Sequence, residues 1–234
     1  MKKFLFIIPL LFAILLSSLP LPVTAQQSNT PLKEVSFFGD STTYGLIRYI
    51  VDNNGSLGTP ITQLHRDQIL VSPDGTFYLR NLPTATVRYQ NSVLKLQDAL
   101  QSASPKILVV TVGINGLPTW TQEDFTENYN RLLTLIQTAT PQTRILLQSV
   151  YPTAKERSPR LKAFTKDKID RLNEWVRSVA RENRMEYLNT ALVLKDQDGW
   201  LHPSYHNGDG MHLNTNGFNQ VLNYIMGYLN QKGN

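Results

Sequence analysis

The 234-residue sequence contains no cysteine, so it forms no disulfide bonds and carries no lipid attached through an N-terminal cysteine. It is also poor in charge: only 18% of the residues are charged, and the formal net charge of +5 is small. A nucleic-acid-binding protein is expected to carry a clustered basic face or stripe, which this balance does not indicate. Because 41% of the residues are hydrophobic, a globular fold with a substantial core is expected and a disordered chain is excluded.

One long apolar run occurs at the N-terminus, over residues 4–16, after Lys2 and Lys3. Small residues follow at positions 23–25, and together these features are typical of a secretory signal peptide spanning residues 1–25, cleaved after Ala25. The run contains Pro9 and is shorter than the roughly 20 residues of a membrane helix, although an uncleaved anchor is the alternative. We therefore expect an exported, extracytoplasmic protein that has no membrane contact after cleavage and no nucleic-acid partner.

Apolar runs alternate with helical patterns beyond a short polar leader at residues 26–33. This alternation predicts an α/β fold in which a parallel sheet is covered by helices on both faces and the site forms at the carboxyl ends of the strands. Residues 34–231 are expected to form a single domain, and the sequence gives no signal for an oligomeric state. Strands are predicted at residues 34–38, 76–79, 106–112, 144–150 and 185–188, and helices at residues 41–51, 121–136, 168–183 and 215–229.

Two short motifs follow predicted strands. Asp40 and Ser41 come directly after Gly39, where the first strand passes into a helix, so the Ser41 hydroxyl is exposed near the positive end of that helix. Gly113 and Asn115 directly follow the strand at residues 106–112. The glycine lets the backbone turn tightly, and an Asn amide in this place is able to donate a hydrogen bond to an oxyanion. Each motif alone is equally an ordinary helix cap or turn.

A third motif, Asp209-x-x-His212, precedes the last predicted helix. Its Asp is able to hold the imidazole Nδ1, so that Nε2 points outward as a general base. Two alternatives remain at this point: a loop His beside an Asx turn, and a zinc site formed by His202, His206, Asp209 and His212. Pro203 and the glycines of this segment argue against the metal site, because they prevent a regular helix from aligning the four side chains.

Taken together and in this order, the three motifs resemble those of the SGNH/GDSL hydrolases, over residues 34–231. The resemblance implies that Ser41 is the nucleophile, His212 the base and Asp209 its orienting partner. It also implies that the Ser41 backbone N–H and the Asn115 side chain donate to the oxyanion. The implied fold is a three-layer α/β/α, flavodoxin-like domain with a mostly parallel sheet of about five strands, and no cofactor or metal.

The sequence departs from the family pattern in two places. The family usually provides a third oxyanion donor, the backbone N–H of a glycine after the second strand. Alignment of Ala85 and Thr86 with the residues that often follow this glycine places Asn81 there, with Gly75 as the competitor. In addition, Gly116 stands where many members have Asp.

The predicted activity is that of a secreted serine esterase acting through an acyl-enzyme on short acyl esters, above all acetyl esters. Its location favours glycans of the cell envelope or the environment as substrates. The alternatives are an acyltransferase with the same three residues and a non-catalytic glycan-binding protein on the same scaffold. The aromatic residues expected either to contact the substrate or to pack in the core are Tyr44, Trp120, Trp200 and Tyr205.

Overall fold

The computed structural model describes residues 32–52 and 64–232. The predicted signal peptide and residues 26–31 of the predicted leader therefore lie outside the described residues. The last leader residues belong to the packed domain, because Leu32 opens a short 3₁₀ helix, η1 (Leu32–Glu34), and is buried in the core. In the two ranges that the structure describes, no helix has both the length and the apolar character needed to cross a bilayer.

Within these ranges, seven strands form one sheet in the order β4-β3-β2-β1-β5-β6-β7. The last five strands in this order are parallel, and β3 and β4 add an antiparallel hairpin at the β2 edge. The parallel part has the flavodoxin-like order, because the chain steps from β1 to one neighbour and then returns to the other side. The strands are β1 (Val35–Gly39), β2 (Ile69–Val71), β3 (Thr86–Tyr89), β4 (Ser92–Lys95), β5 (Ile107–Thr111), β6 (Arg144–Gln148) and β7 (Glu186–Leu188).

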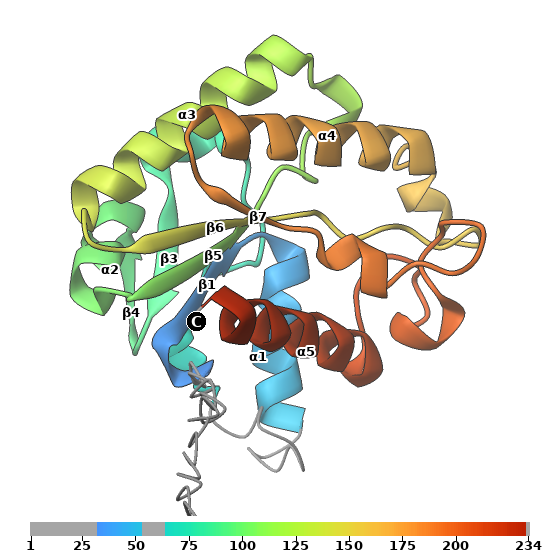
Figure 1. Cartoon of the computed structure of the whole chain (residues 1–234), viewed down its shortest axis with the longest axis horizontal. Helices are drawn as coiled ribbons and strands as arrows, with labels where there is room; N and C mark the ends of the chain where they lie inside the picture. The colour runs from blue at the N-terminus through green and yellow to red at the C-terminus, as the bar shows by residue number, and fades with distance from the viewer. Residues whose placement is uncertain (1–31, 53–63, 233–234) are drawn as a thin grey trace, which may run out of the picture.

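Helices cover both faces of the sheet, which confirms the predicted three-layer α/β/α fold (Figure 1). One layer contains α1 (Ser41–Asp52) and α5 (Thr215–Lys232), and the other contains α2 (Leu96–Ala103), α3 (Gln122–Ala139) and α4 (Lys166–Glu182). Alternate strand residues enter the two cores: Phe37 packs on the α1–α5 side and Phe38 on the opposite side. The central strands β1 and β5 are mostly apolar because both of their faces are buried.

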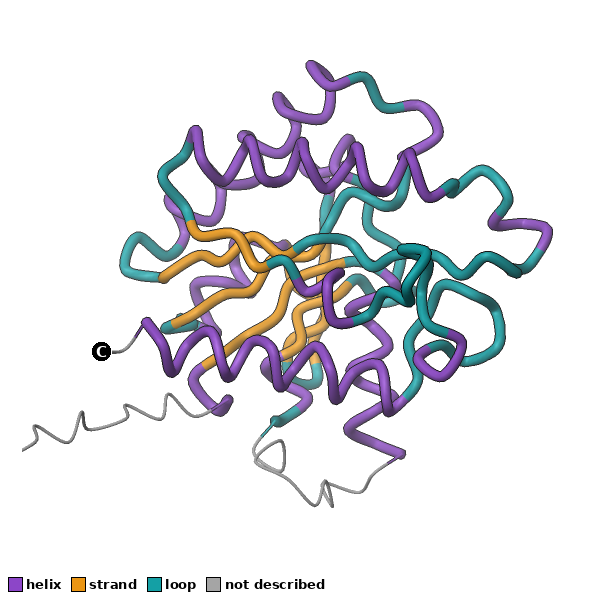
Figure 2. Tube along the Cα trace, turned by 45° about the vertical axis from the view of Figure 1, so that its right-hand side comes forward, coloured by secondary structure: helices purple, strands orange, loops and turns teal. Residues whose placement is uncertain are grey.

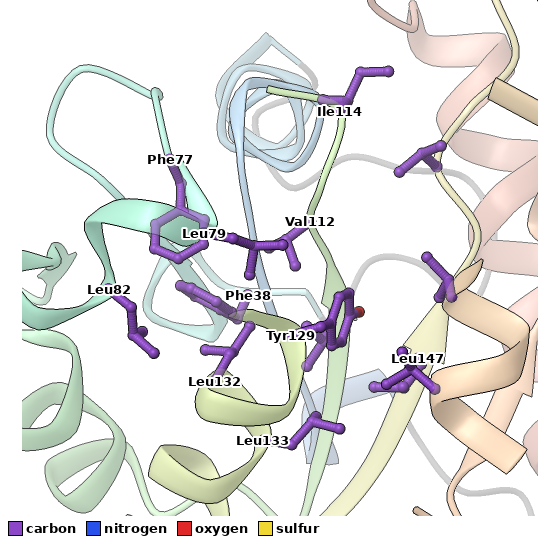
Figure 3. Packing of buried hydrophobic residues seen from close by; sticks show 14 of the residues in the cluster. Phe38, Phe77, Leu79, Leu82, Val112, Ile114, Tyr129, Leu132, Leu133 and Leu147 are labelled. Atoms are coloured by element: carbon purple, nitrogen blue, oxygen red, sulfur yellow. The ribbon is translucent and has the colours of Figure 1, made fainter. Parts of the chain in front are cut away.

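The expected strand at residues 76–79 is wrong. The strand beside β1 is β2, and Leu79 instead begins the 3₁₀ helix η4 (Leu79–Thr84). The apolar residues at 77 and 79 are core anchors: Phe77 and Leu79 are buried, and the Phe77 ring lies edge-on to Phe38, 5.1 Å between centroids (Figure 3). The apolar residues at positions 77 and 79 are therefore explained by burial of their side chains in the core, and this segment does not pair with a neighbouring strand.

The carboxyl ends of the parallel strands lead into long loops that gather beyond one end of the sheet (Figure 2). These loops contain most of the remaining short helices. This arrangement brings the segments after β1, β2 and β5 to the same edge as the segment before α5. The short 3₁₀ helices not yet named are η3 (Arg66–Gln68), η5 (Leu117–Thr119), η6 (Pro159–Leu161), η7 (Thr190–Val193) and η8 (Pro203–Tyr205).

Candidate active site

Ser41 is the first residue of α1, and the turn before it is fixed by sterics and by a cap. A Cβ added to Gly39 would lie 2.0 Å from Thr43 Oγ1 and 2.6 Å from the Thr111 carbonyl oxygen, so only glycine allows β1 to turn here. Asp40 caps the helix, because its Oδ1 accepts hydrogen bonds from the Thr42 backbone N–H at 3.1 Å and from the Thr42 hydroxyl at 2.8 Å. The Ser41 side chain is thereby held at the positive end of α1.

The structure brings Ser41, His212 and Asp209 together in hydrogen-bonding order. His212 Nε2 lies 3.1 Å from Ser41 Oγ, and His212 Nδ1 lies 2.6 Å from Asp209 Oδ2. Asp209 Oδ1 accepts the backbone N–H groups of Met211 and His212, at 2.8 and 2.9 Å. One carboxylate therefore both shapes the loop and orients the ring. In this arrangement Nδ1 donates to Asp209, and the Nε2 lone pair faces the Ser41 hydroxyl.

The Asp209 carboxylate is held in its charged form. Partial burial raises the pKa of Asp209, but hydrogen bonds from the His212 ring and from two backbone N–H groups outweigh burial and leave that pKa below its usual value. Arg160, a largely exposed side chain, places Nη2 3.8 Å from Asp209 Oδ2. The charged state of Asp209 is the one that stabilises an imidazolium at His212.

A loop after β6 supports the segment that carries Asp209, and sequence reasoning missed this contact. The N–H of Ser158 donates to the Asp209 carbonyl at 3.1 Å, and the N–H of Ala154 donates to the Gly210 carbonyl at 2.8 Å. Gly210 has a φ of +83°, and a Cβ there would lie 2.9 Å from Arg157 Cα. No local pattern in residues 154–158 signals this role, because the contact joins segments that lie far apart in the sequence.

Asn115 lies at the same edge, just after β5. Its Nδ2 donates to the Phe77 carbonyl at 3.0 Å, which uses one of the two amide hydrogens and fixes the side-chain plane. Gly113 has a φ of +118°, and a Cβ there would lie 2.7 Å from the Phe125 ring. Gly116 has a φ of +92°, a conformation that an Asp adopts only with strain, so this departure from the family pattern follows from the local backbone.

The third oxyanion donor is not found at Asn81. Asn81 lies in η4, its backbone N–H donates to the Tyr78 carbonyl at 2.9 Å, and it lines a hollow different from the cleft that contains Ser41. Gly75 lies beside α1, since a Cβ there would be 3.1 Å from Tyr44 Cγ, but its N–H donates to the Ser72 carbonyl. Neither N–H is therefore directed at an oxyanion in this structure.

A cleft of about 550 Å³ lies beside Ser41, between α1 and the beginning of α5. Leu213 and Phe218 give it an apolar part, and His212 and Tyr44 lie on its wall. Gly45 allows Phe218 to come close, because a Cβ at Gly45 would lie 2.7 Å from Phe218 Cζ.

Of the four aromatic residues predicted to contact substrate or core, only Tyr44 lines this cleft, with 39% of its surface exposed. Trp120 packs in the core, where the Arg80 guanidinium lies 4.1 Å from its ring centroid. Trp200 lies beneath Arg157, and Tyr205 packs on His202, with 4.9 Å between ring centroids. A substrate-contacting role for these three is not supported, because tertiary packing that the sequence does not reveal uses their rings elsewhere.

The alternative zinc site gains no support from the geometry. His202 Nδ1 accepts the Ser204 N–H at 3.2 Å, and His206 Nδ1 accepts the Gly208 N–H at 3.0 Å, so each ring serves its own turn. In the part of the chain that the structure describes, no three His, Cys, Asp or Glu side chains are grouped so that they could hold a metal ion.

Comparisons with known proteins identify the family and support the fold. Residues 37–219 match the model of the GDSL-like Lipase/Acylhydrolase family. A candidate acylhydrolase from Bacteroides fragilis has a similar structure, at 16% identity and a TM-score of 0.59, covering 85% of this chain and 86% of that one. A GDSL-like lipase from Bacteroides thetaiotaomicron has 18% identity, a TM-score of 0.57, and coverage of 88% and 93%.

An acetyl xylan esterase is also similar in structure, with 18% identity and a TM-score of 0.56, covering 83% of this chain and 97% of that one. A comparison with curated protein sequences found no match. The family match extends over most of the chain and includes Ser41, Asn115, Asp209 and His212. The chain therefore belongs to the GDSL-like lipase/acylhydrolase family and is a serine ester hydrolase.

Proposed function

We propose that this ester hydrolase is an exported enzyme that removes short acyl groups, above all acetyl groups, from glycans, with Ser41, His212 and Asp209 as its catalytic triad. The observation that carries the proposal is the hydrogen-bonded order of the three side chains, with 3.1 Å between Ser41 Oγ and His212 Nε2 and 2.6 Å between His212 Nδ1 and Asp209 Oδ2. A nucleophile, a base and an orienting carboxylate in this order are the requirements of acyl transfer to serine.

The reaction follows from these positions. Ser41 Oγ attacks the ester carbonyl carbon while its proton passes to His212 Nε2, and the negative charge moves to the carbonyl oxygen. The Ser41 backbone N–H at the start of α1 and the second amide hydrogen of Asn115 stabilise this oxyanion. The tetrahedral intermediate then expels the alcohol, which takes the proton from His212, and leaves an acyl-enzyme. Water repeats the sequence and releases the carboxylic acid.

The cleft supports a small acyl group and a polar alcohol. Its apolar part is formed by Leu213 and Phe218, and Tyr44 offers an exposed ring on which a sugar is able to stack. The exposed side chains of Asn207 and Thr215 line the same cleft and are able to bind sugar hydroxyls. Export depends on the predicted signal peptide at residues 1–25.

A panel of p-nitrophenyl esters from acetyl to long acyl chains, with acetylated xylo-oligosaccharides beside it, tests the proposal. We expect the highest kcat/KM with acetyl and a steady fall with chain length. Ser41→Ala should lose turnover and also lose labelling by a fluorophosphonate probe, while its circular dichroism stays that of the wild type. Full activity of Ser41→Ala would contradict the proposed nucleophile, and a preference for long chains would contradict the proposed substrate. Product analysis with added acceptor glycans separates hydrolysis from acyl transfer.

A further inference from the structure

Asp40, the residue before the proposed nucleophile, is completely buried, and the mechanism above does not use its charge. Only one of its oxygens is satisfied: Oδ1 accepts two hydrogen bonds from Thr42, whereas Oδ2 has no hydrogen-bond partner in the described part of the chain. A buried carboxylate oxygen without a partner opposes folding. A function for the charge is therefore required to explain it.

Capping of α1 does not explain it. Serine, threonine and asparagine cap helices about as well as aspartate, because each accepts the same backbone N–H. Any of them would satisfy the Thr42 N–H without placing a carboxylate in the core. What aspartate adds at this position is a negative charge, directly behind Ser41.

The titratable groups that interact with Asp40 through its charge come from three segments of the chain. His212 lies on the loop before α5, Tyr129 on α3, and Tyr151 just after β6, and each interacts electrostatically with Asp40. Tyr129 and Tyr151 are buried, and burial, aided by the charge of Asp40, raises the pKa of both, so they remain neutral. In Figure 3 the Tyr129 ring lies among the core side chains, and its hydroxyl oxygen has no partner in the described residues. Of these groups, only His212 changes its charge during the reaction.

Burial raises the pKa of Asp40 to about 6, against the opposing effects of the Thr42 hydrogen bonds and of His212. Asp40 is therefore mainly ionised above pH 6. In the buried space behind Ser41, its charge is screened far less than a surface charge would be.

We propose that Asp40 is a positioning residue that acts twice: it fixes Ser41 at the start of α1, and its buried charge stabilises the imidazolium that forms on His212 when Ser41 attacks. Two carboxylates then serve one imidazole, Asp209 by direct contact and Asp40 at longer range from the side of the nucleophile. Asp40 touches no substrate. The inference rests on the proposed function, because it requires Ser41 and His212 to act as nucleophile and base.

The test is Asp40→Asn, which keeps an oxygen for the Thr42 N–H and removes the charge. The matched control is Asp196→Asn, since Asp196 Oδ1 also accepts two hydrogen bonds, here from the backbone N–H groups of Asp198 at 3.0 Å and Trp200 at 2.9 Å, away from the cleft. For Asp40→Asn we expect kcat for p-nitrophenyl acetate to fall about tenfold or more, because the charged imidazolium loses part of its stabilisation; tenfold corresponds to about 1.4 kcal/mol. KM should change less than about threefold, because Asp40 touches no substrate.

The pH profile separates this role from a purely structural one. Loss of the negative charge disfavours the imidazolium at His212, so the acid limb of kcat/KM should move to lower pH by about 0.5 unit or more in Asp40→Asn. Its thermal midpoint at pH 8 should not fall, because a buried charge has been removed. The Asp196→Asn protein should match the wild type in rate and in profile.

An Asp40→Asn protein with wild-type kcat and an unmoved profile would overturn the inference, and so would a rise in kcat. Asp40→Ser, a second uncharged cap, provides the same test if the Asn variant does not fold. If neither variant folds, Asp40 acts only in folding and the inference is wrong. Failure of the proposed function is distinct, because it would appear as an active Ser41→Ala enzyme.

Discussion

Replacement of Asp209 by Asn tests the tautomer of His212. The introduced amide would keep an oxygen for the N–H groups of Met211 and His212, which Asp209 Oδ1 now accepts at 2.8 and 2.9 Å. Its NH₂ group would then face His212 Nδ1, in place of the oxygen 2.6 Å away. A donor in that position requires Nδ1 to be the acceptor, so the ring proton moves to Nε2. The nitrogen that lies 3.1 Å from Ser41 Oγ would carry a hydrogen and could not take the serine proton.

The size of the loss follows from this reversal. In a serine protease, the same replacement costs about 10⁴ in kcat, or about 5 kcal/mol of transition-state stabilisation. We expect a loss between about 10³ and 10⁴ here. The replacement also removes the ion pair with Arg160, 3.8 Å from the replaced oxygen, but this pair contributes little because Arg160 lies at the surface.

The assay is hydrolysis of p-nitrophenyl acetate between pH 6 and 9, with Ser41→Ala as the blank. Asp209→Ala is the comparison. Unlike Asp209→Asn, it removes the hydrogen bonds to the N–H groups of Met211 and His212, and it does not impose a tautomer on His212. Circular dichroism should show that Asp209→Asn keeps the fold. An Asp209→Asn enzyme with more than a tenth of the wild-type kcat would refute the reasoning, since the ring would then be oriented by something other than this carboxylate.

Asn115→Ala should lower kcat by about 10² to 10³ with little change in KM, as loss of an oxyanion donor does, and a loss below tenfold would show that its bond to the Phe77 carbonyl is its only role. Gly39→Ala should lower the thermal midpoint by several degrees or prevent folding, because its Cβ would collide with Thr43; an unchanged midpoint would contradict the contact. Burial raises the pKa of Asp40 from 3.8 to about 6, so this carboxyl loses its proton at a lower pH in the unfolded chain than in the folded protein. Its contribution to the free energy of unfolding should therefore decrease as pH rises from about 4 to 6. This decrease should reach about 3 kcal/mol in urea titrations and be absent in Asp40→Asn.

The central strands were predictable because burial on both faces leaves a local signature. Residues 107–110 and 145–147 are apolar runs, and both lie in parallel strands. By contrast, β2 has only three residues, and the hairpin β3–β4 exposes most of its side chains, so neither contains enough apolar residues to show a pattern. The sequence prediction therefore contains five strands, with one of them misplaced, and omits the hairpin.

The site was predictable where a residue's role is tied to its own chain neighbours. Ser41 follows a strand and opens a helix, and Asp209 reaches His212 within one loop, so local spacing carries both signals. Roles that depend on tertiary contact left no such signal. Trp120 reads like a binding-site aromatic, yet Arg80 and the core cover it.

Part of the energetic cost of this fold lies where its proposed chemistry takes place. Of the six buried side-chain polar atoms without partners in the described residues, those on Asp40 and Gln148 belong to residues directly after the carboxyl end of β1 and at the carboxyl end of β6. The strand interiors beside them hold buried apolar side chains. A fold selected for stability alone would fill this edge with apolar side chains or neutral caps. Since a buried charge costs free energy without improving packing, its position directly behind Ser41 is best understood as a requirement of the reaction, and Asp40→Asn should therefore give a protein that is at least as stable and much slower.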